Sequence, residues 1–241
     1  MENIRDTVKI TDIIEWDKSN WAKALPFWKH HLRNENKTNE TKLLKDQKVL
    51  ELGGRCGGLS LWAASLGANV TCSDLENPEK IASPIHNKYP ELQKLIKYES
   101  VNALDIHYEN YFDVICFKSV LGGVASLHEN ARREMLVQIH KALRNGGQLL
   151  FAENLTATNL HMWARKMFRK YEASWSYQYF DDLRKLCSEY FDQKYCTVGF
   201  AGTLGLNETM KVFLGHIDTA LFDWSLPERW RYIFIDFCMK K

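Results

Sequence analysis

A carboxylate followed closely by glycines is the feature of this sequence with the clearest chemical meaning. Glu51 closes an apolar run, and the segment Gly53–Gly58 that follows holds four glycines in six positions. Glycines let a ligand lie against the main chain, and the amphipathic stretch Leu59–Ala68 predicts a helix whose first N–H groups lack intrahelical partners. A strand, a glycine turn and a helix in this order predict a binding site, and the acid suits a ligand that carries an ammonium group.

The glycine spacing excludes two common nucleotide motifs and matches a third. Neither G-x-G-x-x-G nor G-x-x-x-x-G-K followed by Ser or Thr is present. The segment resembles motif I of the class I S-adenosylmethionine-dependent methyltransferases, E-x-G-x-G-x-G: Glu51, Gly53 and Gly57 fall on the pattern, and Arg55 replaces the usual middle glycine. The run GGRCGGLS resembles a variant found in small-molecule methyltransferases of bacterial surface-polysaccharide gene clusters. This resemblance implies an α/β, Rossmann-like class I methyltransferase fold, with S-adenosyl-L-methionine as cofactor and S-adenosyl-L-homocysteine as product.

The resemblance covers roughly residues 49–154 and implies a set of cofactor contacts at the strand ends. The carboxylate of Glu51 is expected near the cofactor's ammonium group, Asp74 on the ribose hydroxyls, Asn102 on the adenine, and Lys118 on the methyl-transfer face. The full set of expected cofactor-binding residues is Glu51, Gly53, Gly54, Arg55, Gly57, Asp74, Leu75, Asn102, Ala103, Lys118 and Ser119.

Each of these polar residues has a plainer alternative. Asp74 is also a typical helix N-cap, and Asn102 a typical turn residue, with Asp105 as the other possible adenine contact. Lys118 is alternatively a solvent-exposed lysine at the end of a strand, or a ligand of an anionic acceptor.

A general base would have to lie beside the methyl acceptor. Glu153, at the end of the fifth strand, and His128, just before a helix whose N-terminus would favour a neutral imidazole, are the candidate catalytic residues. His107 and His161 are weaker candidates, and proximity alone is an alternative to any base. The sequence KSVL stands where amino-group methyltransferases have N/D-P-P-Y/F, so an acceptor oxygen is favoured over nitrogen.

Aromatic and basic segments outside the glycine motif are expected to cover the site and contact the acceptor. The predicted acceptor-binding residues are Trp16, Asn20, Trp21, Asn154, Arg165 and Arg169. The basic, aromatic stretch 162–179 suits an anionic small molecule or saccharide, such as a phosphorylated sugar, or alternatively the head-group layer of a membrane. An amphipathic helix with a solvated basic face is the plain alternative.

The elements that must position these residues alternate between strand and helix patterns, which predicts a mostly parallel seven-stranded sheet with helices on both faces and a helical cap. Strands are expected at Lys48–Leu52, Asn69–Ser73, Leu95–Val101, Phe112–Phe117, Gln148–Ala152, Lys194–Phe200 and Trp230–Lys240. Arg144–Gly147 is expected to end the helix that begins near Glu129. Residues 1–47 are expected to form an N-terminal helical cap, and 48–241 the methyltransferase domain, with cap insertions at about 159–190 and 202–227.

Composition narrows the function further. The chain has 241 residues and a net charge of +2, which gives no support for a nucleic-acid partner. The first ten residues lack the apolar core of a signal peptide, no apolar run approaches a membrane span, and the six cysteines show no metal-ligand spacing. These features predict a cytoplasmic methyltransferase without a metal. A catalytically inactive, cofactor-binding regulatory subunit is the alternative, because Arg55 departs from the motif; a nicotinamide-dependent reductase is disfavoured by the glycine spacing.

Overall fold

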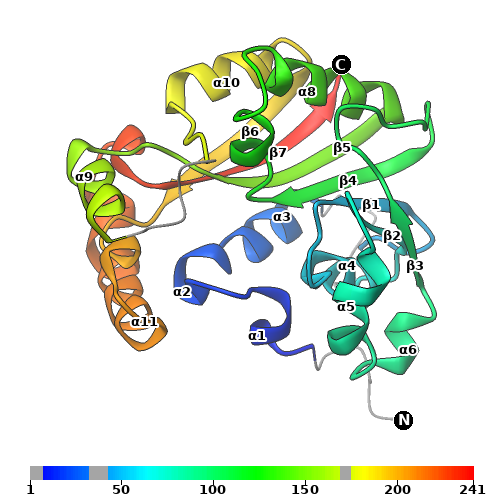
Figure 1. The fold of residues 1–241 in the computed structure, drawn as a ribbon, viewed down its shortest axis with the longest axis horizontal. Helices are drawn as coiled ribbons and strands as arrows, with labels where there is room; N and C mark the ends of the chain where they lie inside the picture. The colour runs from blue at the N-terminus through cyan, green and yellow to red at the C-terminus, as the bar shows by residue number, and fades with distance from the viewer. Residues whose placement is uncertain (1–7, 33–42, 169–174) are drawn as a thin grey trace.

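A seven-stranded sheet forms the centre of the molecule in the computed structural model, which describes residues 8–32, 43–168 and 175–241 (Figure 1). The strands are β1 Lys48–Leu52, β2 Asn69–Asp74, β3 Ile96–Ser100, β4 Phe112–Lys118, β5 Leu143–Asn154, β6 Phe191–Val198 and β7 Ile233–Lys240. Their order is β3-β2-β1-β4-β5-β7-β6, with β1 to β5 parallel and β7 antiparallel to both of its neighbours. The predicted mostly parallel seven-stranded sheet is therefore confirmed.

Helices cover both faces of the sheet. They are α1 Ile10–Ile13, α2 Lys18–Trp21, α3 Ala24–Leu32, α4 Gly58–Ser65, α5 Pro78–His86, α6 Pro90–Gln93, α7 Leu121–Val124, α8 Ala131–Ala142, α9 Asn159–Phe168, α10 Phe180–Ser188, α11 Glu208–Ile217 and α12 Asp223–Ser225. Figure 1 shows α8 and α10 on one face and α1 to α4 on the other. Short 3-10 and π turns at 202–204, 218–222 and 228–230 complete the region around α11.

Side chains of the central strands point alternately into two apolar clusters. In β4, Val114 and Cys116 join the cluster with α3 and α4, whereas Ile115 and Phe117 join the cluster with α8 and α10. A parallel strand covered on both faces is a near-continuous apolar run, which explains the sequence FDVICF. The two clusters hold the carboxyl ends of β1, β2 and β4 in fixed positions relative to one another.

The N-terminal helices lie over the glycine turn and over the end of the sheet. A Cβ atom at Gly58 would lie 2.1 Å from the main-chain oxygen of Ile13, so α1 and α4 approach as closely as their backbones allow. Further on, the indole N–H of Trp28 in α3 donates to the main-chain oxygen of Asp236 in β7 at 2.9 Å. Gly215 of α11 gives a similar close contact to Ser19 of α2.

Arg144–Gly147 was expected to form the turn that ends a helix, but these residues belong to β5. The helix ends at Ala142, and β5 begins at Leu143, opposite Phe112, with an irregularity in register before Gln148 pairs with Val114. Gly146 has a φ of +72°, which lets these residues bulge out of the strand rather than form a separate turn. No helix within the described ranges is long and apolar enough to span a bilayer.

Candidate active site

The glycine turn joins β1 to α4 and has no room for side chains on its inner surface. Gly53 and Gly57 have φ values of +59° and +69°, and a Cβ atom at Gly54 would lie 2.9 Å from the carboxyl carbon of Glu51. Arg55, at the position of the usual motif glycine, also has a left-handed backbone with a φ of 46°. The substitution therefore keeps a conformation that glycine adopts more easily.

Glu51 is buried beneath this turn and bound to the start of α4. Its carboxylate accepts hydrogen bonds from the main-chain N–H groups of Leu59 (3.2 Å) and Ser60 (2.8 Å) and from the Ser60 hydroxyl (2.5 Å). Burial raises the pKa of Glu51 to about 7, against the effect of these hydrogen bonds. The side chain nevertheless lines a cavity at the turn, together with Gly53 and Gly54.

Asp74 links the glycine turn to the end of β2. One carboxylate oxygen accepts the N–H of Arg55 at 2.9 Å, and the other accepts the N–H of Leu75 at 2.7 Å. A carboxylate has about four lone-pair directions, so Asp74 keeps acceptor capacity for a ligand. Asp74 is not the N-cap of α5, whose N-cap is Asn77. The Leu75 side chain is exposed.

The end of β3 forms a turn around the predicted adenine contact. The side-chain oxygen of Asn102 accepts the N–H of Leu104 at 3.0 Å, and Asn102 pairs with Asp105 in an isolated bridge. Ala103, at the tip, is partly buried. The turn explanation for Asn102 therefore holds, and its contact with an adenine stays a prediction.

Lys118 at the end of β4 is not the solvent-exposed lysine of the plain alternative. Its ammonium nitrogen lies 3.5 Å from the ring centroid of Trp16 and 5.3 Å from that of Trp21. Burial lowers the pKa of Lys118 to about 8. The next residue, Ser119, has a φ of 57°, and its hydroxyl accepts from the side-chain amide of Asn154 at 2.9 Å.

Two cavities meet at Lys118. The one at the glycine turn, which we call the turn cavity, has a volume of about 20 Å³. The second, which we call the acceptor cavity, has a volume of about 280 Å³. It is lined by Trp16, Asp17, Trp21, Arg55, Lys118, Ser119, Asn154, Arg165, Trp175, Tyr177, Thr203, Lys211 and Tyr232. A further cavity of about 610 Å³ continues from Arg165 between α9 and residues 203–211.

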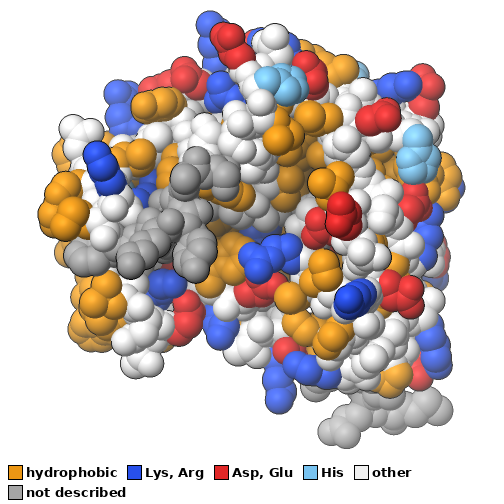
Figure 2. Space-filling model, in the orientation of Figure 1, with side chains coloured by type: hydrophobic (Ala, Val, Ile, Leu, Met, Phe, Trp, Pro, Cys, Tyr) orange, Lys and Arg blue, Asp and Glu red, His pale blue; other side chains and the backbone are white. Residues whose placement is uncertain are grey.

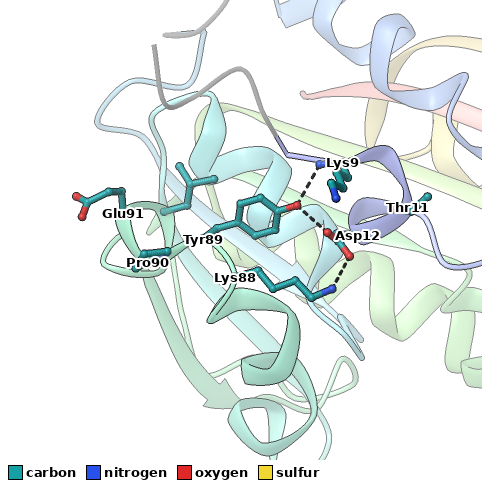
Figure 3. A pocket seen from close by; sticks show the side chains of 8 residues that line it. Lys9, Thr11, Asp12, Lys88, Tyr89, Pro90 and Glu91 are labelled. Atoms are coloured by element: carbon teal, nitrogen blue, oxygen red, sulfur yellow. Dashed lines mark hydrogen bonds and ion pairs between the residues drawn. The ribbon is translucent and has the colours of Figure 1, made fainter. Parts of the chain in front are cut away.

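The residues that line the turn cavity suit a nucleoside cofactor chemically. The cavity is too small to hold one unless the N-terminal segment shifts. The turn offers bare main chain between two carboxylates, Glu51 and Asp74. Ligand pockets of this kind usually hold about 300 Å³ or more, whereas Ile13, Glu15 and Trp16 cover the turn here. Figure 3 shows how α1 is held at its far end: the Tyr89 hydroxyl donates to the Asp12 carboxylate at 2.6 Å.

Asp17 lies in the N-terminal stretch that was expected to cover the site, but the sequence did not indicate it as a catalytic residue. It is 3% exposed, has a left-handed backbone with a φ of 44°, and lines the acceptor cavity. One carboxylate oxygen accepts the hydroxyl of Tyr232, 215 residues later; the other, Oδ1, has no hydrogen-bond partner among the described residues. Burial raises the pKa of Asp17 to about 7. A buried acid at a strained backbone position is a recognisable signal, but only in three dimensions.

Glu153 was predicted to face the acceptor, but it does not line the acceptor cavity. It is fully buried, and its carboxylate accepts the N–H groups of Val120 (3.0 Å), Leu121 (2.8 Å) and Asn154 (2.8 Å). Its place at the end of β5 is as expected, but the side chain turns back to fix the segment after β4. Burial raises the pKa of Glu153 to about 7.

The histidine candidates also lie away from the acceptor cavity. His128 is about half exposed, with Nε2 3.6 Å from the Glu134 carboxylate, and does not line the acceptor cavity. His107 is exposed beside Glu99. His161 is buried, and its ring nitrogens contact the Thr158 hydroxyl and the main-chain oxygen of Phe200.

Four of the six predicted acceptor residues line the acceptor cavity: Trp16, Trp21, Asn154 and Arg165. The fifth, Asn20, does not; it is fully buried and donates to the Asp218 carboxylate and the Tyr232 hydroxyl, each at 2.8 Å. Asn20 therefore supports the wall behind Asp17. Arg169 lies outside the described residues.

The Arg165 side chain is fixed between α9 and the end of β5. Its guanidinium donates to the main-chain oxygen of Leu155 at 2.9 Å and lies 3.9 Å from the ring centroid of Tyr177. Within the described part of the chain, no group of three or more His, Cys, Asp or Glu residues is placed to hold a metal ion.

Known proteins resemble the chain at three levels. A family model described as a methyltransferase domain matches residues 50–151. A curated relative, the ribosomal protein L11 methyltransferase of Prochlorococcus marinus, is 28% identical over 116 residues, which is 47% of this chain and only 36% of the relative's length.

Solved structures share the fold at low sequence identity. The YcgJ protein of Bacillus subtilis has a TM-score of 0.62 at 10% identity, over 91% of this chain and 99% of that one. A complex of Haemonchus contortus phosphoethanolamine N-methyltransferase 2 with phosphomonomethylethanolamine and S-adenosylhomocysteine has a TM-score of 0.59 at 15% identity, over 92% of this chain and 52% of that one. The matched residues include the glycine turn, and the strand order is that of the class I methyltransferase fold, so residues 50–151 carry a methyltransferase domain whose cofactor is S-adenosyl-L-methionine.

Proposed function

We propose that this protein transfers the methyl group of S-adenosyl-L-methionine to an oxygen of a small anionic acceptor bound in the acceptor cavity. The observation that carries the proposal is the charge of that cavity: four cationic side chains, Arg55, Lys118, Arg165 and Lys211, line it with one carboxylate, Asp17. Cationic side chains around a cavity favour phosphate or carboxylate groups.

Not all four cations contribute equally. Arg55 lies 3.8 Å from Glu15, and Lys211 lies 3.1 Å from Glu208. Lys118 has no ion pair within the described residues, and its ammonium group rests on the face of Trp16. Lys118 is therefore the side chain that we expect to hold the anionic group of the acceptor.

Aromatic side chains form most of the remaining wall of the acceptor cavity. Trp16, Trp21, Trp175, Tyr177 and Tyr232 offer flat apolar faces beside the cations. A volume of about 280 Å³ suits a phosphorylated monosaccharide or a single substituted ring better than a larger molecule. The Haemonchus enzyme of similar fold is solved with a phosphorylated small molecule, which is compatible with an anionic acceptor. Together with the GGRCGGLS run, these features support a role in surface-polysaccharide modification.

The protein's own residues would act on the acceptor proton and on water. When bound, the cofactor supplies a methyl group that is already activated by its sulfonium. Asp17 Oδ1 accepts the proton of the acceptor hydroxyl, while Tyr232 holds the other oxygen and fixes the carboxylate. A base is most effective when its pKa lies near the working pH, and the pKa of Asp17 is about 7. The aromatic walls exclude water.

Hydrophobic side chains are exposed near this site, over α9 and α11 (Figure 2). They include Met162, Trp163 and Met167 in α9 and Met210 and Phe213 in α11. Contact of this surface with a membrane that carries a lipid-linked acceptor stays a prediction, which cosedimentation with anionic lipid vesicles would test.

Calorimetry and a methyl-release assay together test the proposed function. We expect S-adenosylhomocysteine to bind, and a panel of sugar phosphates and sugar acids to be methylated while the matching neutral sugars are not. Methylation of neutral sugars at equal rates would contradict the anionic acceptor. Binding without methylation of any compound would favour the inactive regulatory subunit.

A further inference from the structure

Lys118 occupies the junction between the two cavities of the site. The turn cavity and the acceptor cavity share three lining residues, Trp16, Arg55 and Lys118. The Arg55 side chain is 67% exposed, whereas Lys118 is half-buried, so Lys118 is the less exposed cation at the junction. A methyl group that passes from a cofactor at the turn to an acceptor has to cross this junction.

Nothing within ion-pair distance neutralises Lys118 among the residues described. Its ammonium group lies on the Trp16 ring, a contact that stabilises the charge but leaves it in place. The carboxylates that act on it at longer range are Glu15 from the N-terminal segment, Glu51 from β1 and Glu153 from β5, and Arg55 opposes them. On the acceptor side, the charged groups that line the cavity with Lys118 are Asp17, Arg165 and Lys211.

A second positive charge brought to this junction is repelled by Lys118. The sulfonium of S-adenosylmethionine carries such a charge, whereas the sulfur of S-adenosylhomocysteine is neutral. Charge repulsion between neighbouring groups is strong where water is largely excluded. An anion beside Lys118 in the acceptor cavity would offset the repulsion.

We propose that Lys118 makes the site select its nucleoside by charge: it weakens binding of the sulfonium cofactor relative to the thioether product until an anion fills the acceptor cavity. This inference rests on the proposed function. Acceptor and cofactor then strengthen each other's binding, and the charge relief is available for the transfer, because the positive charge disappears from sulfur as the methyl group leaves.

Calorimetry with the two nucleosides tests the inference without an identified acceptor. Both ligands carry the same amino and carboxylate groups, so the ratio of their dissociation constants isolates the sulfonium. We expect the wild-type protein at pH 7 to bind S-adenosylhomocysteine at least tenfold more tightly than S-adenosylmethionine. Lys118→Met should reduce this ratio below threefold by tightening S-adenosylmethionine binding, and Lys118→Arg should preserve it. Inorganic phosphate should tighten S-adenosylmethionine binding to the wild type and to Lys118→Arg, but not to Lys118→Met.

One further measurement, at higher pH, tests the inference without any variant. In the wild type, raising the pH from 7 to 9 deprotonates Lys118, so the ratio should fall even if Lys118→Met does not fold. A ratio near one in the wild type, or a tenfold ratio that survives in Lys118→Met, overturns the charge selection. Failure of the wild type to bind either nucleoside would instead overturn the proposed function.

Discussion

Single residues decide which of the buried acids can act on an acceptor. Glu51 and Glu153 are as buried as Asp17, and burial raises the pKa of all three to about 7. Glu51 and Glu153, however, bind main-chain N–H groups at the start of α4 and after β4. Asp17 alone among these three has an oxygen without a partner in the described chain, and Asp17 is one of the residues that line the acceptor cavity.

Replacing Asp17 by Asn should lower the methyl-transfer rate about 100-fold or more, because general-base catalysis typically contributes 10²–10⁴-fold. S-adenosylhomocysteine binding should stay within twofold of wild type. The base works in its ionised form, so the wild-type kcat should rise with pH through about 7, and this rise should be absent in Asp17→Asn. The pH–rate profile with the acceptor found by the methyl-release assay is the measurement.

Asp192→Asn, at an exposed position on β6, is the matched control and should leave rate and profile unchanged. The base assignment is refuted if Asp17→Asn keeps the wild-type pH profile.

Local sequence predicted the residues of the glycine turn, because β1, the turn and α4 are continuous in the chain. It could not predict Asp17 and Tyr232 as partners, since 215 residues separate them. Glu153 shows a different limit: its position at a strand end was predictable, but the direction of its side chain depends on the segment after β4.

At the scale of elements, the N-terminal segment Ile10–Trp16 controls access to the glycine turn. One end is held by the Asp12 carboxylate, which accepts from Tyr89 and from Lys88 at 2.9 Å (Figure 3). The other end is held by Trp16, whose ring lies against Lys118. Between these points the main chain rests directly on α4 at Gly58. Cofactor binding therefore requires this segment to shift, which makes its closure a step in the cycle.

Adding one methyl group at Gly58 should loosen this segment. In Gly58→Ala, the new Cβ would lie 2.1 Å from the Ile13 oxygen, while α4 itself tolerates alanine better than glycine. We expect amide hydrogen exchange of residues 10–16 to speed up at least fivefold and S-adenosylhomocysteine to associate faster. Mass spectrometry and stopped-flow tryptophan fluorescence would measure the two effects.

Ser65→Ala, in the last turn of the same helix, serves as the control because the Ser65 hydroxyl donates to the main-chain oxygen of Trp62 in α4 itself. Unchanged protection of residues 10–16 in Gly58→Ala would show that the segment does not rest on this contact.

The elements themselves were largely predictable, since the alternation of apolar strands and amphipathic helices is a local pattern. Their ends were less so. β6 begins at Phe191 rather than Lys194, and β7 begins at Ile233 because a 3-10 turn takes up residues 228–230. These differences arise from pairing between β6 and β7, which a single strand's sequence does not encode.

At the scale of the whole molecule, one buried acid in the sheet lowers the free energy of unfolding. Asp236 lies in β7, between β5 and β6; it is fully buried, and burial raises its pKa to about 7. The folded state therefore binds a proton that the unfolded chain releases near pH 4. Stability falls as the pH rises from about 4 to about 7, and the full cost applies above pH 7.

Asp236→Asn should raise the free energy of unfolding by about 2–4 kcal/mol at pH 8. The gain should shrink by half or more at pH 5, where the wild-type side chain is already neutral in the folded state. Urea denaturation at both pH values, with exposed Asp192→Asn as the comparison, measures this. A gain that is the same at pH 5 and pH 8 would rule out the ionisation of Asp236 as its cause.

The hydrogen bond between Asp17 and Tyr232 joins two residues that are synthesised far apart in time. Once about 75 residues have left the ribosome, the nascent polypeptide already contains both acids that flank the glycine turn. Residue 232, by contrast, emerges just before the strand that must slot between β5 and β6. A partly translated chain can thus contain the glycine turn while Tyr232, which lines the acceptor cavity, is still missing. We therefore expect methyl transfer only after β7 has joined the sheet.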